Sequence, residues 1–272
     1  MSDKFSAIWV SHSSINDFLR CPRLYYLNNV YKNPKTGRKI SLTNPHLSLG
    51  QVVHDVLESL SELPAEKRFD IPLKVLLGIK WQKVHGKMGG FRDDIEEMQY
   101  KDRALTMLSN VESNPGPILE KAIKLKQDLP WYWLSEENNI ILCGKIDWIK
   151  YNQEDDTVEI IDFKTGKNEE SVNSLQLAIY RLLLENSQKR KIKKASYWYL
   201  DKGEIADFDL PPLLESEKRV MEIALKIKEA RRKNDFACER SGCYACEALE
   251  KIVSNKAEFV GVGEYNKEIY IA

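Results

Sequence analysis

The sequence carries no net charge, because 41 lysines and arginines balance 41 aspartates and glutamates among its 272 residues. A balanced surface gives no overall attraction to nucleic acid, although it still permits a local basic groove. No apolar run reaches the ~20 residues that span a bilayer. The first residues, MSDKFSAIWVSHSS, also lack the apolar core and cleavage site of a signal peptide. We therefore expect a cytoplasmic protein without a membrane partner.

The sequence also lacks internal repeats, low-complexity segments and helicase motifs. Its hydrophobic fraction of 43% is enough to build a real core. The order of apolar patterns predicts an α/β fold in a single domain, residues 1–272. The expected helices are 13–31, broken at Pro22, then 47–63, 174–186 and 215–233. The expected strands are 138–151, 157–164 and two within 195–210. A helical insertion is expected at 64–130 and a terminal hairpin at 257–272.

One predicted strand contains charged residues where apolar ones would be expected. It reads TVEIIDFKTG, and it places Asp162 and Lys164 two positions apart. Side chains of a strand alternate between faces, so these two charges share one face. A solvent-exposed strand with scattered charges would give the same pattern. The alternative is a site that needs an acid and a base together.

The neighbouring strand supplies a second acid. If the two strands form an antiparallel hairpin with Tyr151 opposite Val158, then Asp147 lies opposite Asp162 and Lys145 opposite Lys164. Directly opposed carboxylates repel each other. A divalent cation between them removes that repulsion, and oxygen ligands suit Mg²⁺ or Mn²⁺. The register depends on the turn, and a slip by one residue would separate the acids.

Four short motifs, in this order, resemble the PD-(D/E)XK nuclease superfamily in its RecB-type branch. This branch includes the nuclease domains of recombination helicase–nucleases and CRISPR-associated adaptation exonucleases. The motifs are Gly50-x-x-x-His54 on a helix, Gly144-x-x-Asp147 and Asp162-x-Lys164-Thr165-Gly166 on strands, and Gln176-x-x-x-Tyr180 on a helix. The resemblance covers about residues 10–250.

The resemblance implies a restriction-endonuclease-like mixed central sheet flanked by helices, and hydrolysis of phosphodiester bonds with Mg²⁺ or Mn²⁺. Lys164 would orient the attacking water or stabilise the transition state, and Gln176 and Tyr180 would hold Lys164 or contact DNA. Taken alone, a helical histidine or tyrosine is as readily a core residue. The implied metal ligands are His54, Asp147, Asp162 and the backbone carbonyl of Phe163.

Three of the five cysteines lie within nine residues, at Cys238, Cys243 and Cys246. This spacing is typical of metal ligands, and Cys21 is the natural fourth. The resemblance implies a four-iron four-sulfur cluster that joins the terminal regions. The sequence departs from the family pattern, since the extra cysteine precedes the C-x2-C pair and position 252 is isoleucine. Four thiolates also suit Zn²⁺. We expect Cys143 to be uninvolved.

The resemblance implies that the protein is a DNA exonuclease that prefers single-stranded ends. It would act in DNA repair, recombination or CRISPR adaptation. A helicase or a CRISPR adaptation protein would be a possible partner. The alternative is a non-catalytic DNA-binding or complex-assembly module that keeps the fold. Two groups of basic residues are candidate phosphate contacts, at 189–194 and 231–233. The aromatic run 197–199 fits a core strand better than a base-stacking surface.

Overall fold

The computed structural model describes residues 3–127, 129–240 and 242–272. The chain divides into two compact units. The first unit combines residues 1–44, 133–142 and 218–272, and the second combines 45–132 and 143–217. Each unit is described by itself below, and the expectation of a single domain stays a prediction.

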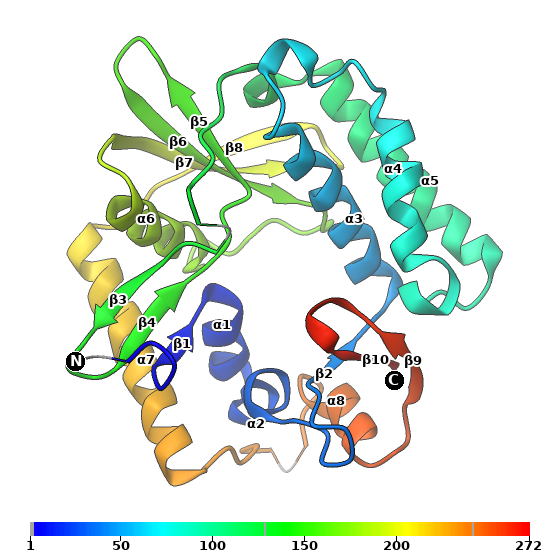
Figure 1. Ribbon diagram of the computed structural model, residues 1–272, viewed down its shortest axis with the longest axis vertical. Helices are drawn as coiled ribbons and strands as arrows, with labels where there is room; N and C mark the ends of the chain where they lie inside the picture. Colours follow the sequence, from blue (N-terminus) through cyan, green and yellow to red (C-terminus); the bar gives the residue numbers. More distant parts are fainter. Residues whose placement is uncertain (1–2, 128, 241) are drawn as a thin grey trace. The chain divides into compact units, whose positions relative to one another are not determined.

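The second unit contains a four-stranded mixed sheet in the order β5-β6-β7-β8 (Figure 1). Its strands are β5 (Trp148–Asn152), β6 (Thr157–Lys164), β7 (Lys191–Tyr199) and β8 (Glu204–Phe208). β6 pairs with β5 in antiparallel and with β7 in parallel orientation, and β8 is antiparallel to β7. Helix α6 (Gln176–Ser187) provides the crossover from β6 to β7, as parallel neighbours require. The predicted pairing of Tyr151 with Val158 is confirmed.

Three helices of the second unit pack on one another: α3 (Pro45–Leu60), α4 (Leu73–Trp81) and α5 (Asp94–Ser113). Short 3-10 turns join them at Ala65–Lys67, Gln82–Val84 and Gly86–Gly89, and another, Gly116–Leu119, follows α5. Their apolar faces share one core with the sheet, in which Leu57, Trp148 and Trp198 are buried. The predicted insertion therefore contributes core to the unit that holds the D-x-K strand.

The predicted strand 138–151 is two strands, β4 (Ile140–Cys143) and β5, with a break between them. At Gly144 the backbone N–H leaves the ladder and donates to the carbonyl of Pro130 at 3.1 Å. A Cβ at this position would lie 3.0 Å from Leu183, so the close approach favours glycine. The β5–β6 ladder begins at Trp148 opposite Ile161. Asp147 therefore lies just outside the ladder.

The first unit holds two small sheets and four α-helices among the described residues. The sheets have the orders β1-β4-β3 and β2-β10-β9. The strands are β1 (Ile8–Val10), β2 (Ile40–Leu42), β3 (Trp131–Ser135), which begins in the second unit, β9 (Glu258–Val262) and β10 (Glu268–Ile271). The helices are α1 (His12–Arg20), α2 (Pro22–Tyr25), α7 (Leu213–Lys233), which begins in the second unit, and α8 (Glu247–Val253). A π-helical turn, Tyr26–Val30, and a 3-10 turn, Glu264–Asn266, complete the elements.

The helix break predicted at Pro22 is confirmed, since α2 begins there with proline at its first position. The N-terminal cap of α1 is Ser11. The Ser14 backbone N–H donates to the Ser11 side chain at 3.3 Å, and the Ser14 side chain accepts from the Ser11 N–H at 2.8 Å. Strands β1 and β2 were not expected from the sequence. Each is three residues long and pairs with a strand distant in sequence, so local pattern carries no signal for them.

These elements confirm the expected fold class, a mixed α/β structure flanked by helices, with four cysteines brought together. Among the described residues, no helix is both long enough and apolar enough to cross a membrane.

Candidate active site and cysteine cluster

Helix α3 packs closely against the end of the central strand β6 at a glycine, Gly50. A Cβ added to Gly50 would lie 3.1 Å from the side-chain oxygen of Thr165, tighter than nine in ten real Cβ contacts. This close approach brings His54, one turn further along α3, to the first acid. The Nδ1 atom of His54 lies 3.3 Å from Oδ2 of Asp147. The spacing of the Gly50-x-x-x-His54 motif therefore has a packing reason.

Asp147 is held by the backbone of the neighbouring strand. Its Oδ2 accepts a hydrogen bond of 2.9 Å from the backbone N–H of Phe163. The ring of Phe163 packs in the core between those of Trp148 and Trp198. The carboxylate of Asp147 is 15% exposed. The break before β5 thus turns this acid towards β6, although it is not a ladder residue.

The side-chain amide of Gln176, the first residue of α6, connects the remaining predicted residues. Its Nε2 donates to Oδ1 of Asp162 at 2.7 Å and to the hydroxyl of Tyr180 at 3.2 Å. Its Oε1 accepts from the ammonium of Lys164 at 2.5 Å. Lys164 also lies 3.0 Å from Oδ2 of Asp162. One amide therefore fixes the acid and the base of the D-x-K strand at once.

The pKa values of the two acids are shifted in opposite directions. Burial raises the pKa of Asp162 to about 7, and the nearby charge of Asp147 adds to this. Burial also acts to raise the pKa of Asp147, but the charge and hydrogen bond of His54 outweigh it and lower that pKa. Two neighbouring carboxylates with diverging pKa values are typical of functional sites. Asp147 is the acid that keeps its charge.

The neighbouring carboxylates raise the pKa values of both basic partners. Burial acts to lower the pKa of Lys164, but the carboxylates of Asp162 and Glu170 outweigh it and raise that pKa. For His54, burial likewise acts to lower the pKa, and Asp147 reverses the shift. Burial raises the pKa of the Tyr180 hydroxyl well above its usual value, so it stays neutral. Lys164 is therefore a cation held beside the acid pair.

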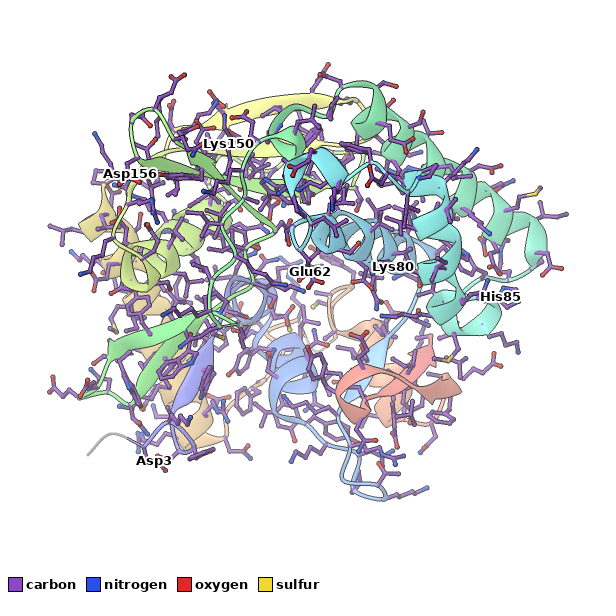
Figure 2. The ribbon with its side chains drawn as sticks, turned by 45° about the horizontal axis from the view of Figure 1, so that its top comes forward. Asp3, Glu62, Lys80, His85, Lys150 and Asp156 are labelled. Atoms are coloured by element: carbon purple, nitrogen blue, oxygen red, sulfur yellow. The ribbon has the colours of Figure 1, made fainter. Side chains whose placement is uncertain are left out.

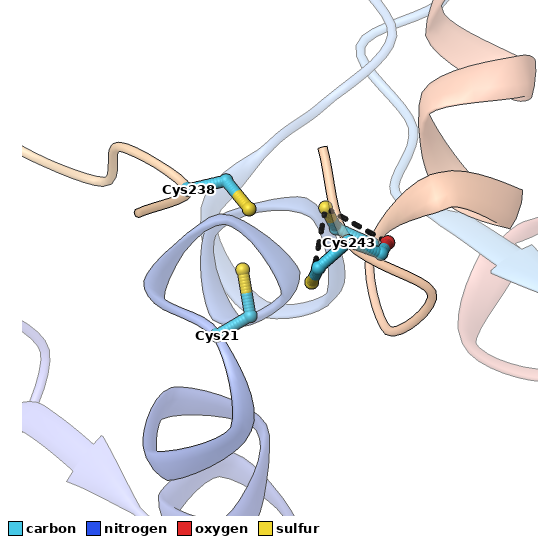
Figure 3. A group of neighbouring side chains, drawn as sticks. Cys21, Cys238 and Cys243 are labelled. Atoms are coloured by element: carbon cyan, nitrogen blue, oxygen red, sulfur yellow. Dashed lines mark hydrogen bonds between the residues drawn. The ribbon is translucent and has the colours of Figure 1, made fainter. Parts of the chain in front are cut away.

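The four predicted cysteines come together in the first unit (Figure 3). Their sulfur atoms all lie within 4.8 Å of one another. Cys21 lies at the junction of α1 and α2, and Cys246 precedes α8. The sulfurs of Cys243 and Cys246 are 3.7 Å apart. This is a set of thiol ligands that can bind a metal, as the spacing predicted.

The surroundings favour the thiolate at Cys243, one of the four sulfurs. Backbone N–H groups of Cys246 and Ala245 point at Cys243 and lower its pKa to about 7, which favours the thiolate. Beside the cluster, Arg23 forms an ion pair of 2.5 Å with Glu250 on α8. Cys143 belongs to the second unit, where burial raises its pKa to about 11. It is a buried thiol that is not part of the cluster.

Comparison with models of known protein families shows which superfamily the chain belongs to. A model of the PD-(D/E)XK nuclease superfamily matches residues 9–255. The chain belongs to this superfamily. The match covers both the acid–lysine site and the four cysteines, and it indicates a metal-dependent nuclease with DNA as its substrate. No curated protein matches the sequence.

The residues of the nuclease site fit a divalent metal. Oδ2 of Asp162 is buried and accepts no hydrogen bond, and its contact with Lys164 is an ion pair only. A buried acceptor left without a hydrogen bond is costly unless another partner is available. Carboxylate oxygens such as those of Asp147 and Asp162 are the ligands that suit Mg²⁺ and Mn²⁺. The carbonyl of Phe163 as a further ligand stays a prediction.

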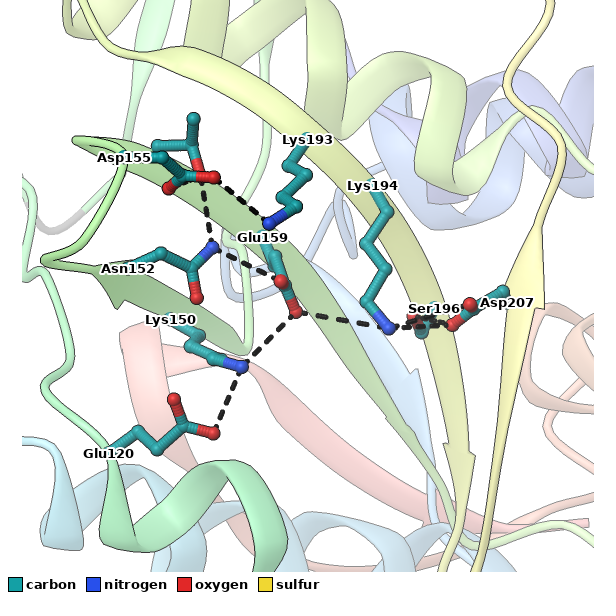
Figure 4. Close-up of polar contacts among 10 residues, drawn as sticks. Glu120, Lys150, Asn152, Asp155, Glu159, Lys193, Lys194, Ser196 and Asp207 are labelled. Carbon is teal, nitrogen blue, oxygen red and sulfur yellow. Dashed lines mark hydrogen bonds and ion pairs between the residues drawn. The ribbon is translucent and has the colours of Figure 1, made fainter.

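The two basic groups expected to contact phosphate lie partly in ion pairs, and their contact with nucleic acid stays a prediction. The basic group at 189–194 is largely paired with acids: Arg190 with Asp156, and Lys193 with Asp155. Figure 4 shows the pair of Lys193 and Asp155, together with the buried Glu159 and its ion pair with Lys150. In the other basic group, Arg232 and Lys233 both pair with Glu229. The aromatic run 197–199 is buried, as the core interpretation predicted.

The structure adds residues that the motifs did not indicate. Lys145, expected opposite Lys164, instead forms an ion pair of 2.5 Å with Glu58 on α3. Arg103 on α5 donates to the carbonyl of Thr165 at 2.7 Å and also binds Asp201. Glu170 lies 2.9 Å from the ammonium of Lys164. Glu170 is in the link between β6 and α6, where no periodic pattern marks a contact.

Proposed function

We propose that this nuclease hydrolyses phosphodiester bonds in DNA as an exonuclease that acts on single-stranded ends. The observation that carries the proposal is the buried, unbonded oxygen of Asp162 beside the ammonium of Lys164. His54 and Asp147 lie next to this point and complete the donor set. The order of the four motifs supports placement in the RecB-type branch.

Each residue has a proposed role in the reaction. Asp147, Asp162 and His54 would hold Mg²⁺ or Mn²⁺, which lowers the pKa of a bound water and polarises the phosphate. Lys164 orients the attacking water or stabilises the charge that develops on the phosphate. Gln176 keeps Lys164 and Asp162 in register through its two hydrogen bonds. Tyr180 orients the Gln176 amide from one helical turn away.

Cleavage of end-labelled DNA tests the proposal directly. Single-stranded and double-stranded substrates are incubated with Mg²⁺ or Mn²⁺, with wild type beside Asp162→Asn. Asp207→Asn is a matched control, since Asp207 is an acid of β8 that pairs with Lys194 outside the site. We expect cleavage from the ends by wild type and Asp207→Asn, and at least ~100-fold less by Asp162→Asn. Equal cleavage by all three would refute the assignment, and DNA binding without cleavage would favour a non-catalytic module.

We base the proposed biological setting on the resemblance to the RecB-type branch. RecB-type nucleases act beside helicases in recombination and repair, or in CRISPR adaptation, and we propose one of these settings for this chain. We propose a helicase or a CRISPR adaptation protein as the partner in these settings. Cleavage of long duplex DNA that depends on an added helicase would support the first setting.

We also propose that Cys21, Cys238, Cys243 and Cys246 hold a metal centre that stabilises the first unit. Two centres take four thiolates: an iron–sulfur cluster, which the resemblance implies, and one zinc ion. The 3.7 Å between two of the sulfurs is close to the edge of a single-ion tetrahedron, which is ~3.8 Å for Zn–S bonds of ~2.3 Å. Metal analysis and an absorbance spectrum of anaerobically purified protein decide between iron and zinc.

A further inference from the structure

The ammonium group of Lys164 is surrounded by oxygen atoms on three sides. Oε1 of Gln176 lies 2.5 Å from it, Oε2 of Glu170 2.9 Å and Oδ2 of Asp162 3.0 Å. The aromatic ring of Tyr197 lies beneath it, with its centroid 4.8 Å away. An ammonium has three N–H donors and no more. One donor is used by Gln176, and the other two oxygens and the ring crowd the remaining donors. A water or a phosphate can therefore reach the ammonium only if one of the oxygens leaves.

The three oxygens differ in how firmly they are held. Asp162 is on the central strand, is 1% exposed, and accepts a hydrogen bond from Gln176. Gln176 begins α6 and also donates to Tyr180. Glu170 lies in the β6–α6 link, and its side chain is 30% exposed. Of the three, Glu170 is the group that can leave at the lowest cost.

The backbone at Glu170 has an anchor of its own. Its N–H donates to the hydroxyl of Tyr199 on β7 at 3.0 Å. The position of the link therefore does not depend on the carboxylate alone. A rotation about the Glu170 side chain can release Lys164 while the backbone stays bound to β7.

We propose that the Glu170 carboxylate occupies the place of a nucleic-acid phosphate on Lys164, and that substrate binding displaces it. A carboxylate oxygen and a phosphodiester oxygen are both anionic acceptors for an ammonium group. Glu170 thus positions Lys164 in the absence of substrate and competes with the substrate for it. The inference rests on the proposed function, because it assigns the competing ligand to the same site.

Binding of a fluorescent single-stranded oligonucleotide, with Ca²⁺ in place of Mg²⁺, tests the competition. Glu170→Gln keeps the size and removes the charge, and it should lower Kd about three- to fivefold, the range that a partly exposed ion pair of ~1 kcal/mol supplies. Glu169→Gln is the matched control, since Glu169 is the adjacent acid and pairs with Lys202 at 2.9 Å. It should change Kd by less than ~1.5-fold.

A double-variant cycle assigns the effect to Lys164. In a Lys164→Met background, Glu170→Gln should no longer change Kd, because the shared partner is gone. In the cleavage assay, Glu170→Gln should lower KM by a similar factor and leave kcat within about twofold. Glu170→Ala should behave in the same way, which guards against an effect specific to glutamine.

Three outcomes would overturn the inference: a Kd that is unchanged or higher in Glu170→Gln, an equal gain in Glu169→Gln, or a gain that persists without Lys164. If the proposed function is wrong, the experiments give a different set of results. In that case no variant cleaves DNA, yet Glu170→Gln still tightens binding through Lys164.

Discussion

Asp147 accepts a hydrogen bond of 2.9 Å from the backbone N–H of Phe163, the residue that follows the second acid of the site. The bond joins a carboxylate outside the sheet to the strand at its centre. A backbone donor cannot rotate away as a side chain can, so the direction of Asp147 is set by the path of β6. The geometry of the acid pair therefore depends on the fold around it.

The first prediction concerns the approach of α3 to β6. Gly50→Ala should displace the helix, because its Cβ would lie 3.1 Å from Thr165. The control is Gly78→Ala on α4, where nothing lies within 4 Å of the new Cβ. Alanine in an open helical position should stabilise by ~0.5–1 kcal/mol. Thermal unfolding should show that gain for Gly78→Ala only, and cleavage should fall only for Gly50→Ala. Equal behaviour of the two variants would contradict the packing argument.

The second prediction is a pH dependence of stability caused by Asp162. Its pKa is about 7 in the folded protein and near 3.8 without the fold. Between these values the unfolded chain is ionised while the folded one holds the proton, so stability falls as pH rises from about 4 to 7. Each unit of pKa difference corresponds to ~1.4 kcal/mol. Urea unfolding in EDTA should show this slope in wild type and a smaller one in Asp162→Asn; parallel curves would contradict it.

The third prediction separates two residues of α6. Gln176→Glu loses both N–H donors and adds a charge beside Asp162, so kcat should fall by ~100-fold or more. Tyr180→Phe removes one of three hydrogen bonds of Gln176 and should lower kcat less than about tenfold. Steady-state cleavage kinetics measure both effects. A larger loss for Tyr180→Phe would mean that the tyrosine acts directly on the substrate.

The fourth prediction concerns the cysteine cluster. Cys21→Ser should lose the bound metal and lower the free energy of unfolding by several kcal/mol, because metal binding is coupled to folding. Cys143→Ala is the control and should keep a full complement of metal, since Cys143 is not part of the cluster. Elemental analysis with urea unfolding measures both. Equal metal content in the two variants would argue against the four-thiolate centre.

The fifth prediction concerns a buried acid of the helical layer. Glu97 accepts from the indole N–H of Trp81 at 2.8 Å and from the backbone of Gly86 at 2.9 Å. His85, labelled in Figure 2, lies 2.9 Å away. Glu97→Ala leaves these donors unpaired and should cost ~2–4 kcal/mol. Glu96→Ala, whose partner is the exposed Arg92, should cost less than ~1 kcal/mol.

The same acid gives a testable pH effect. Burial acts to raise the pKa of Glu97, but His85 and the Gly86 N–H outweigh it and lower that pKa below 4.5. Its contribution to stability is therefore present above about pH 4.5 and is lost as pH falls through the lowered value. The difference in unfolding free energy between wild type and Glu97→Gln should shrink below pH 4.5. A difference that is constant with pH would contradict the assignment.

The sequence by itself determined the features that depend on neighbours along the chain. Alternation with period two and the polar turn between the two strands set the register of Tyr151 with Val158. Apolar spacing predicted α6 and α7, and Pro22 predicted the break after α1. The cysteine spacing indicated ligands, and the structure brings them together. Each of these signals is local, because backbone geometry repeats every two or 3.6 residues.

Only the tertiary structure decided the contacts that join distant segments. Counting residues along the hairpin placed Asp147 in the ladder. In the structure, close packing at Gly144 ends the strand, and Asp147 accepts a hydrogen bond from a backbone N–H of β6 instead. Strands β1 and β2 form because β4 and β10 lie beside them. Glu170 reaches Lys164 from a link that has no periodic pattern. Local backbone geometry leaves a periodic pattern in the sequence and can be predicted from it. These contacts instead depend on which distant segments the fold brings together.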